Sequence, residues 1–267
     1  DARLLRGEGR YLGDVDLPRQ AYAVVLRSPH AHARIRDIDT AAATAAPGVL
    51  AVYTGRDYAS DGLGGPKAGM PRKKADGSPM FAPQRPALCV DRVRYVGDPV
   101  AFVVAESVNQ AKDAAELVTV DYEPLASVTD TAMAPLPGAP AVWDECPDNI
   151  SHVMALGDKA ATDAAFAKAG HVLRRRYVIT RVHAQFMEPR GALGTFDRSE
   201  QRYTLYADCQ YPHRVRNMLA ESVFKVPESQ MRVITNDVGG GFGTKGWQYV
   251  EHRLVPWAAR KLGRPVK

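Results

Sequence analysis

The sequence lacks long apolar runs and is poor in cysteine. None of its uninterrupted apolar stretches approaches the roughly 18 residues that a membrane-spanning helix needs, and the start, DARLLRGEGRY, lacks the apolar segment of a signal peptide. Its three cysteines, Cys89, Cys146 and Cys209, are far apart, so they fit neither a zinc finger nor a disulfide framework. These absences favour a cytoplasmic protein without a membrane span.

A strong excess of charge of one sign is also missing. The 35 Lys and Arg residues against 30 Asp and Glu residues leave a net charge of +5, which would suit an anionic cofactor, an acidic partner or a nucleic acid. The basic runs at 72–74 and 174–176 are short, however, and no aromatic residues alternate with them as in a groove for single-stranded nucleic acid. We therefore expect no nucleic-acid partner.

Hydrophobic periodicity predicts strands and helices in mixed order. The expected strands lie at 20–26, 34–39, 49–53, 92–105 (two strands hinged at Gly97 to Pro99), 118–122, 171–179, 192–197, 202–208 and 231–238. The expected helices lie at 108–118, 159–169 (with Asp158 as N-cap), 213–224 (opened by Pro212) and 247–262 (followed by Gly263). Because strands and helices do not alternate strictly, we predict an α+β fold.

Two stretches rich in Pro interrupt this pattern. Residues 54–86 combine many Gly and Pro residues with no periodicity, over a length that is unusual for a simple connection. We predict that they form a functional loop or contact a partner. Residues 129–149 are rich in Pro and Ala, as is typical of a linker. The sequence therefore predicts one domain at 1–128, a linker at 129–149 and a second domain at 150–267.

The strongest local signal is the segment GGGFGTKG at 239–246. Gly239, Gly240, Gly241 and Gly243 remove side chains at a point where a backbone must approach another group closely, and their N–H groups can then face an anion. The segment lies between an expected strand and an expected helix, where the helix dipole also favours negative charge. A tight turn would need only one or two glycines. We therefore predict a ligand-binding loop.

The ligand of this loop is open at this level. Gly241, Gly243 and Gly246 also satisfy the dinucleotide pattern G-x-G-x-x-G, but KLGRPVK stands where the acidic residue of that pattern is expected. An NADP-dependent reductase is therefore one alternative, and a non-catalytic module that binds a cofactor or another subunit is a second. A P-loop is excluded, because the glycine that this motif requires directly before its lysine is missing at Lys245.

Other polar residues are weaker candidates. Gln210 follows an expected strand and precedes an expected helix, which is a site-like position, although an exposed loop glutamine is the simpler interpretation. His30 and His32 have no third ligand at a useful spacing, so a structural or solvent-facing pair is favoured over a metal site. Glu188 could be a general base, but an ion pair with Arg190 is the simpler expectation.

Taken together, these segments resemble the large subunit of the xanthine dehydrogenase, aldehyde oxidase and carbon monoxide dehydrogenase family of molybdenum hydroxylases. The first domain resembles that family's α/β hammerhead domain, and the second resembles the first, incomplete part of its molybdopterin-binding domain. The hammerhead segments are RLLRGEGRYLGDVDLP, RSPHAHARI, RYVGDPVAFVVAES and VDYEPL. The molybdopterin segments are MEPRGA, Gln210 with the following Pro-His, and DVGGGFGTK.

The resemblance implies a cofactor and roles for particular residues. The cofactor would be molybdenum held by molybdopterin cytosine dinucleotide. Gln210 would donate its side-chain amide to an oxygen ligand of the metal without being a direct ligand, and the backbone of Phe242 and Gly243 would lie beside the metal and offer an N–H group. Gly240, Gly241 and Thr244 would border the pterin together with Phe242 and Gly243.

The resemblance also implies a reaction and partners. The reaction would hydroxylate an aldehyde or an N-heterocyclic carbon with oxygen derived from water, and the electrons would leave through [2Fe-2S] and FAD centres. Those centres would lie on an iron–sulfur small subunit and an FAD-binding medium subunit, and the rest of the large subunit would bind this chain. Purine-oxidising members carry a Glu where this chain has Gly246, so the resemblance argues against xanthine as the substrate. The family's catalytic Glu is expected beyond Lys267.

Overall fold

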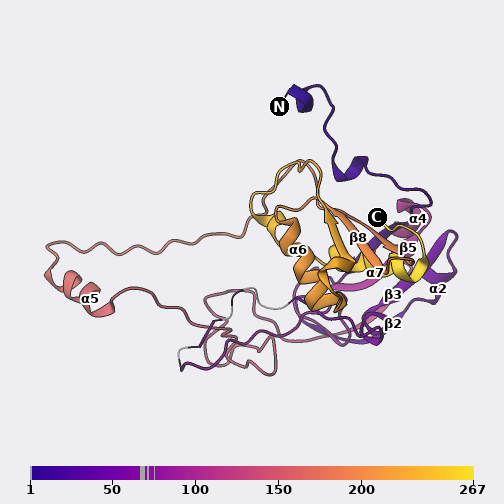
Figure 1. The fold of residues 1–267 in the computed structure, drawn as a ribbon. Helices are drawn as coiled ribbons and strands as arrows, with labels where there is room; N and C mark the ends of the chain where they lie inside the picture. The colour runs from indigo at the N-terminus through magenta and orange to yellow at the C-terminus, as the bar shows by residue number, and fades with distance from the viewer. Residues whose placement is uncertain (1, 67–69, 71, 75) are drawn as a thin grey trace.

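The computed structural model describes residues 2–66, 70, 72–74 and 76–267 (Figure 1). Two small sheets and their helices make up the first half of the chain, which confirms the expected mixture of strands and helices. No helix in the described part of the chain is long and apolar enough to cross a membrane. The elements of this half are α1 (Ala2–Leu5), η1 (Leu12–Asp14), β1 (Tyr22–Arg27), β2 (Ala33–Asp39), α2 (Ala41–Ala45), β3 (Val49–Thr54), α3 (Gly55–Ser60), β4 (Arg92–Val93), β5 (Pro99–Ala105), α4 (Val108–Glu116) and β6 (Thr119–Pro124).

Strand β5 is the centre of the first half. It lies between β1 and β3 in an antiparallel sheet, and all seven of its residues are buried. Ala101 and Val103 pack with α2 and α4, whereas Phe102 and Val104 point to the opposite face and join the largest apolar cluster. Because both faces are covered, the strand is continuously apolar rather than alternating.

The second half of the chain forms a third sheet in the order β7-β8-β9. Strand β8 pairs antiparallel with β7 and parallel with β9. Helix α7 lies so close to β7 that a Cβ atom on Gly194 would come within 2.4 Å of the Pro256 nitrogen, so this contact requires glycine. The elements of this half are α5 (Lys159–Lys168), β7 (Ala192–Asp197), β8 (Arg202–Ala207), α6 (Pro212–Met218), the π-helical turn η2 (Leu219–Phe224), η3 (Glu228–Gln230), β9 (Met231–Ile234), η4 (Thr244–Gly246) and α7 (Glu251–Leu262).

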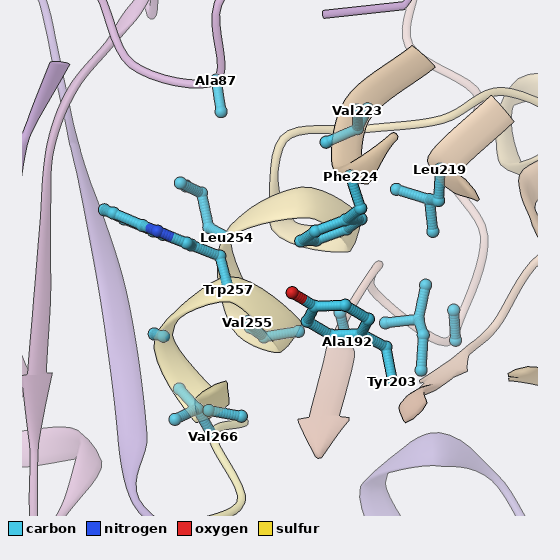
Figure 2. Packing of buried hydrophobic residues seen from close by; sticks show 14 of the residues in the cluster. Ala87, Ala192, Tyr203, Leu219, Val223, Phe224, Leu254, Val255, Trp257 and Val266 are labelled. Carbon is cyan, nitrogen blue, oxygen red and sulfur yellow. The ribbon is translucent and has the colours of Figure 1, made fainter. Parts of the chain in front are cut away.

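The largest apolar cluster joins the two halves. Phe102 and Val104 of β5 share this cluster with Tyr203 of β8 and Trp257 of α7. Figure 2 shows Trp257, Tyr203 and Phe224 packed around the turns of α7. The predicted domain bounds, 1–128 and 150–267 with a linker at 129–149, stay a prediction. The two halves of the chain share one apolar core.

A long excursion leaves this body between the linker and β7. Helix α5 lies far from all three sheets at the tip of this excursion, and none of its residues is buried (Figure 1). Its N-cap is Asp158, as predicted, whose side chain accepts a hydrogen bond from the Ala161 N–H group at 2.9 Å. The strand expected at 171–179 is wrong, because this segment is exposed and no described strand lies beside it to pair with its backbone.

Several other boundaries differ from the expectations. The helix opened by Pro212 changes to a π-helical turn after Met218, and the strand expected at 231–238 ends at Ile234. The last helix begins at Glu251 rather than at 247, and it ends, as predicted, at Gly263, which adopts a left-handed conformation. Residues 54–86 contain the short helix α3, which the sequence pattern did not predict.

Candidate cofactor-binding site

The topology of the third sheet brings three polar segments to one edge. Because β8 and β9 are parallel, the residues that follow them lie at the same edge, and these are Gln210 and the glycine loop at 239–243. Strand β7 runs in the opposite direction, so the residues that precede it, 186–191, also lie at this edge. Segments that are separated by up to about fifty residues in the sequence therefore form one site.

The glycine loop has an unusual backbone conformation. Gly240 and Gly243 have φ angles of +97° and +79°, and Phe242 also lies in the left-handed region with a φ of +45°. A non-glycine residue in this region costs on the order of 1 kcal/mol and persists where the surroundings hold it. The hydroxyl of Thr244 donates a hydrogen bond to the Gly241 carbonyl at 2.9 Å, and the Tyr249 hydroxyl donates to the Thr244 carbonyl. The Phe242 side chain is 73% exposed.

The loop presents backbone donors that the protein itself does not use. Within the described residues, the N–H groups of Gly240, Gly241, Phe242 and Gly243 have no hydrogen-bond acceptor. The N–H group of Gly239 is different, because it donates to Glu188 Oε2 at 2.7 Å. Four successive free amides at a strand end are a typical anion-binding arrangement, so the predicted ligand-binding residues come together here.

Gln210 packs directly on this loop. A Cβ atom on Gly241 would lie 2.7 Å from Gln210 Cδ and 2.8 Å from its Oε1, so the carboxamide occupies the space that a side chain would fill. Its backbone N–H group donates to the Lys245 carbonyl at 3.0 Å. Gln210 is exposed, and it lines an open hollow of about 370 Å³ with Tyr211, Pro212, His213 and Arg214. The structure therefore places Gln210 beside the glycine loop.

Sequence reasoning missed a buried ammonium group beneath the loop. The Lys245 side chain is completely buried, and its Nζ lies 2.5 Å from Asp208 Oδ2 and 3.0 Å from Glu188 Oε2. Burial raises the pKa of Asp208, and the adjacent Lys245 ammonium opposes this shift. Lysine is rarely buried, so no sequence signal pointed to this arrangement.

The predicted ion pair between Glu188 and Arg190 is wrong. Glu188 pairs with Lys245, whereas Arg190 Nε binds Glu251 at 3.0 Å and the Arg190 guanidinium stacks on the Tyr249 ring at 3.7 Å. Glu188 and Arg190 are two residues apart in a non-helical segment and have different partners. The structural role expected for Glu188 is thus confirmed, but with a partner 57 residues away.

The two histidines of the first half are engaged in local contacts. The His30 ring lies 4.8 Å from the Tyr122 ring, and His32 Nδ1 is 2.9 Å from the Ala126 carbonyl. The described residues contain no group of three or more His, Cys, Asp or Glu side chains that could hold a metal ion.

The protein thus has an α+β fold with four free backbone N–H groups at one edge of its third sheet, and known protein families match both halves of the chain. Residues 6–126 match the aldehyde oxidase and xanthine dehydrogenase a/b hammerhead domain, and residues 142–267 match the molybdopterin cofactor-binding domain. Between them the two matches cover nearly the whole chain. The chain belongs to the family of molybdenum-containing xanthine dehydrogenase, aldehyde oxidase and carbon monoxide dehydrogenase large subunits.

Individual relatives agree with this assignment. The chain is 39% identical to the nicotine 6-hydroxylase large subunit of Paenarthrobacter nicotinovorans and 36% identical to the carbon monoxide dehydrogenase large chain of Afipia carboxidovorans. Each match covers 100% of this chain but only 32% and 33% of the relative. The structure of quinoline 2-oxidoreductase from Pseudomonas putida 86 matches with a TM-score of 0.87 and 38% identity, over 100% of this chain and 33% of that one.

The glycine loop lies within the part of the chain that matches the molybdopterin-binding domain. Its structure also differs from a dinucleotide-binding turn, in which the third glycine packs in the first turn of a helix. Here a 3-10 turn at 244–246 follows the loop, and α7 begins only at Glu251. The comparisons therefore support the molybdopterin interpretation over the NADP-dependent reductase.

Proposed function

We propose that this chain supplies the molybdopterin-contacting edge of an enzyme that hydroxylates an aldehyde or an N-heterocyclic carbon with oxygen derived from water. The chain spans about one third of the length of the curated relatives that it matches. Two relatives at 38–39% identity carry the names of N-heterocycles, nicotine and quinoline, which favours that substrate class. In this proposal the electrons pass to [2Fe-2S] and FAD centres on an iron–sulfur small subunit and an FAD-binding medium subunit.

One observation carries the proposal, namely the free amides of residues 240–243 beside the Gln210 carboxamide. A molybdenum-bearing pterin dinucleotide carries anionic oxygen atoms, and successive backbone N–H groups are a general device for binding such oxygens. Glycine at 241 leaves room for Gln210, and glycine at 239 leaves room for Glu188, whose Cβ would lie 2.5 Å from an added methyl group. These residues therefore fit the cofactor that the family implies, in the proposed cytosine dinucleotide form.

Each residue of the site has a separate task in this proposal. The backbone of Phe242 and Gly243 would lie beside the metal centre, and the Gln210 carboxamide would donate a hydrogen bond to it. Gly240, Gly241 and Thr244 would border the pterin, although Thr244 already donates its hydroxyl proton to Gly241. When bound, the cofactor supplies two-electron oxidation chemistry. The chain's own contribution is to hold and orient it with donors that are already in place.

The rest of the large subunit is proposed as the partner of the exposed excursion. Tyr177 and Ile179 are 83% and 93% exposed on the segment that precedes the site. Large apolar side chains at such exposure usually mark a surface that another part of the protein covers.

The proposal is tested on the native enzyme that contains this sequence. Metal analysis by mass spectrometry and chromatography of the released nucleotide should give one molybdenum and one cytidine nucleotide for each copy of the chain. The medium and small subunits should copurify, with the absorbance of flavin and iron–sulfur centres. A native enzyme without molybdenum that binds a nicotinamide nucleotide instead would refute the proposal.

A further inference from the structure

The Lys245 ammonium is a charged group of the site that the proposed chemistry does not use. Its side chain is 0% exposed. Its Nζ lies 2.8 Å from the Glu188 carbonyl oxygen, 3.0 Å from Glu188 Oε2 and 2.5 Å from Asp208 Oδ2. The two contacts with Glu188 are hydrogen bonds, and the contact with Asp208 is an ion pair, so the ammonium is surrounded by oxygen atoms of the protein. Because the Lys245 side chain is completely buried among these groups, its ammonium does not reach a cofactor or a substrate.

The groups around Lys245 belong to the three segments that build the site. Glu188 precedes β7, and its Oε2 also accepts the Gly239 N–H group at 2.7 Å. Asp208 follows β8 two residues before Gln210, and its Oδ1 accepts the Gly191 N–H group at 3.2 Å. Lys245 itself follows the loop after β9, and one ammonium thus connects the ends of all three strands.

Lys245 also contacts the functional groups of the site through its backbone. Its carbonyl accepts the Gln210 N–H group at 3.0 Å, and its own N–H group donates to the Gly241 carbonyl at 3.3 Å. The distance between Gln210 and Gly241 sets the position of the Gln210 carboxamide relative to the free amides. A shift of Lys245 would therefore be transmitted to both.

We propose that Lys245 is a positioning residue, whose ammonium fixes the Gln210 carboxamide relative to the free amides of residues 240–243. This inference rests on the proposed function, because the positioned groups are those that would hold the cofactor. The alternative is that the buried charges only stabilise the fold. If the charges are removed without loss of stability, turnover falls when Lys245 positions the site and stays unchanged when it only stabilises the fold.

The charge balance suggests suitable variants. Lys245→Met alone would leave Asp208 and Glu188 buried without their cation, and breaking a buried ion pair in this way is strongly destabilising. The triple variant Lys245→Met, Asp208→Asn, Glu188→Gln removes all three charges with little change in volume, and such neutral replacements are often tolerated. Asp208→Asn alone keeps an acceptor for Gly191. If Lys245→Met does not fold, the triple variant and Asp208→Asn still test the proposal.

Lys261→Met is the matched control. Lys261 also pairs with one aspartate, because its Nζ lies 2.8 Å from Asp61 Oδ2, but it is on α7 and 35% exposed. The variants are made in the complete enzyme. The measurements are Tm, molybdenum content, the electron paramagnetic resonance spectrum of the molybdenum centre, and kcat and KM with an N-heterocyclic substrate.

Positioning predicts a specific pattern in the triple variant. Tm and molybdenum content stay close to those of the wild type, the resonance spectrum changes shape, and kcat falls by about 10-fold to 10²-fold with KM unchanged, as for a misplacement near 1 Å. Asp208→Asn shows a smaller change of the same kind, and Lys261→Met shows none. A triple variant with wild-type stability, spectrum and kcat would overturn the inference. Molybdenum and cytidine in the wild-type enzyme decide the proposed function separately.

Discussion

Replacing Gly241 by alanine should disturb Gln210 without disturbing the fold. The added methyl group would lie 2.7 Å from Gln210 Cδ and 2.8 Å from both its Cγ and its Oε1. Optimal contact between such atoms is roughly 3.5 Å or more, so the carboxamide has to move by about 1 Å. Gln210 is exposed and can rotate away, and no positive φ angle stands against a side chain at Gly241.

The effects on stability and on turnover should therefore separate. Stability should change by no more than about 1 kcal/mol, because the loss of chain entropy in the unfolded state favours Gly→Ala and roughly offsets the local crowding. A shift of about 1 Å in a positioned group can lower kcat by about 10²-fold. Gln210→Ala, which deletes the donor, should lower kcat by about 10²-fold to 10³-fold, or about 3–4 kcal/mol in transition-state stabilisation.

A double-mutant cycle in the complete enzyme tests this reasoning. Turnover, molybdenum content and thermal unfolding are measured for Gly241→Ala, Gln210→Ala and the double variant. Because the methyl group acts through Gln210, the double variant should be no slower than Gln210→Ala. Gly170→Ala is the control, because nothing lies within 4 Å of a Cβ atom at that glycine and its φ is not positive. Additive losses of kcat, or a fully active Gly241→Ala enzyme, would refute the proposed contact.

Three further predictions concern the chain as a whole. Burial lowers the pKa of His252 from 6.5 to about 4. Between these two pH values the histidine binds a proton in the unfolded state but not in the folded state, so the free energy of unfolding should fall by about 3 kcal/mol as the pH drops from 6.5 to 4. Chemical unfolding of His252→Asn should show a flatter pH profile over this range. Trypsin should cut first within the exposed run at 174–176, and the two fragments produced by this cleavage should still copurify through their shared apolar cluster; fragments that separate would contradict this. The 267-residue chain alone should self-associate and retain no molybdenum, and sedimentation should show more monomer when Tyr177 and Ile179 are replaced by serine.

Local sequence patterns predicted much of the fold because local forces determine those elements. The apolar run of β5, the N-cap Asp158 and the terminal Gly263 all act over a few residues, and the structure contains each of them. The glycine loop and Gln210 were also recognisable, since each lies between a strand and a helical turn. Residues 171–179 show the limit of this approach, because alternation marks a segment able to form a strand but not whether a partner strand is present.

The part of the site that could not be predicted depends on pairing over long distances. No periodicity in the sequence shows that β8 and β9 are parallel, yet this pairing is what places Gln210 beside the glycine loop. The partner of Glu188 is likewise set by the fold, and sequence proximity to Arg190 suggested the wrong cation. Lys245 looked like a residue of the ligand-binding loop, and its burial follows only from the convergence of three strand ends.

The parallel pairing of β8 and β9 also sets the order in which the site can form. Strands β7 and β8 are joined by a short turn and can pair early, because closing a short loop costs little entropy. Strand β9 can add to β8 only after residues 208–230 have formed the crossover of α6, η2 and η3. Pairing of this kind is intrinsically slow. The step that completes the sheet is therefore also the step that brings the proposed cofactor site together, so we expect the cofactor to bind only after β9 has paired with β8.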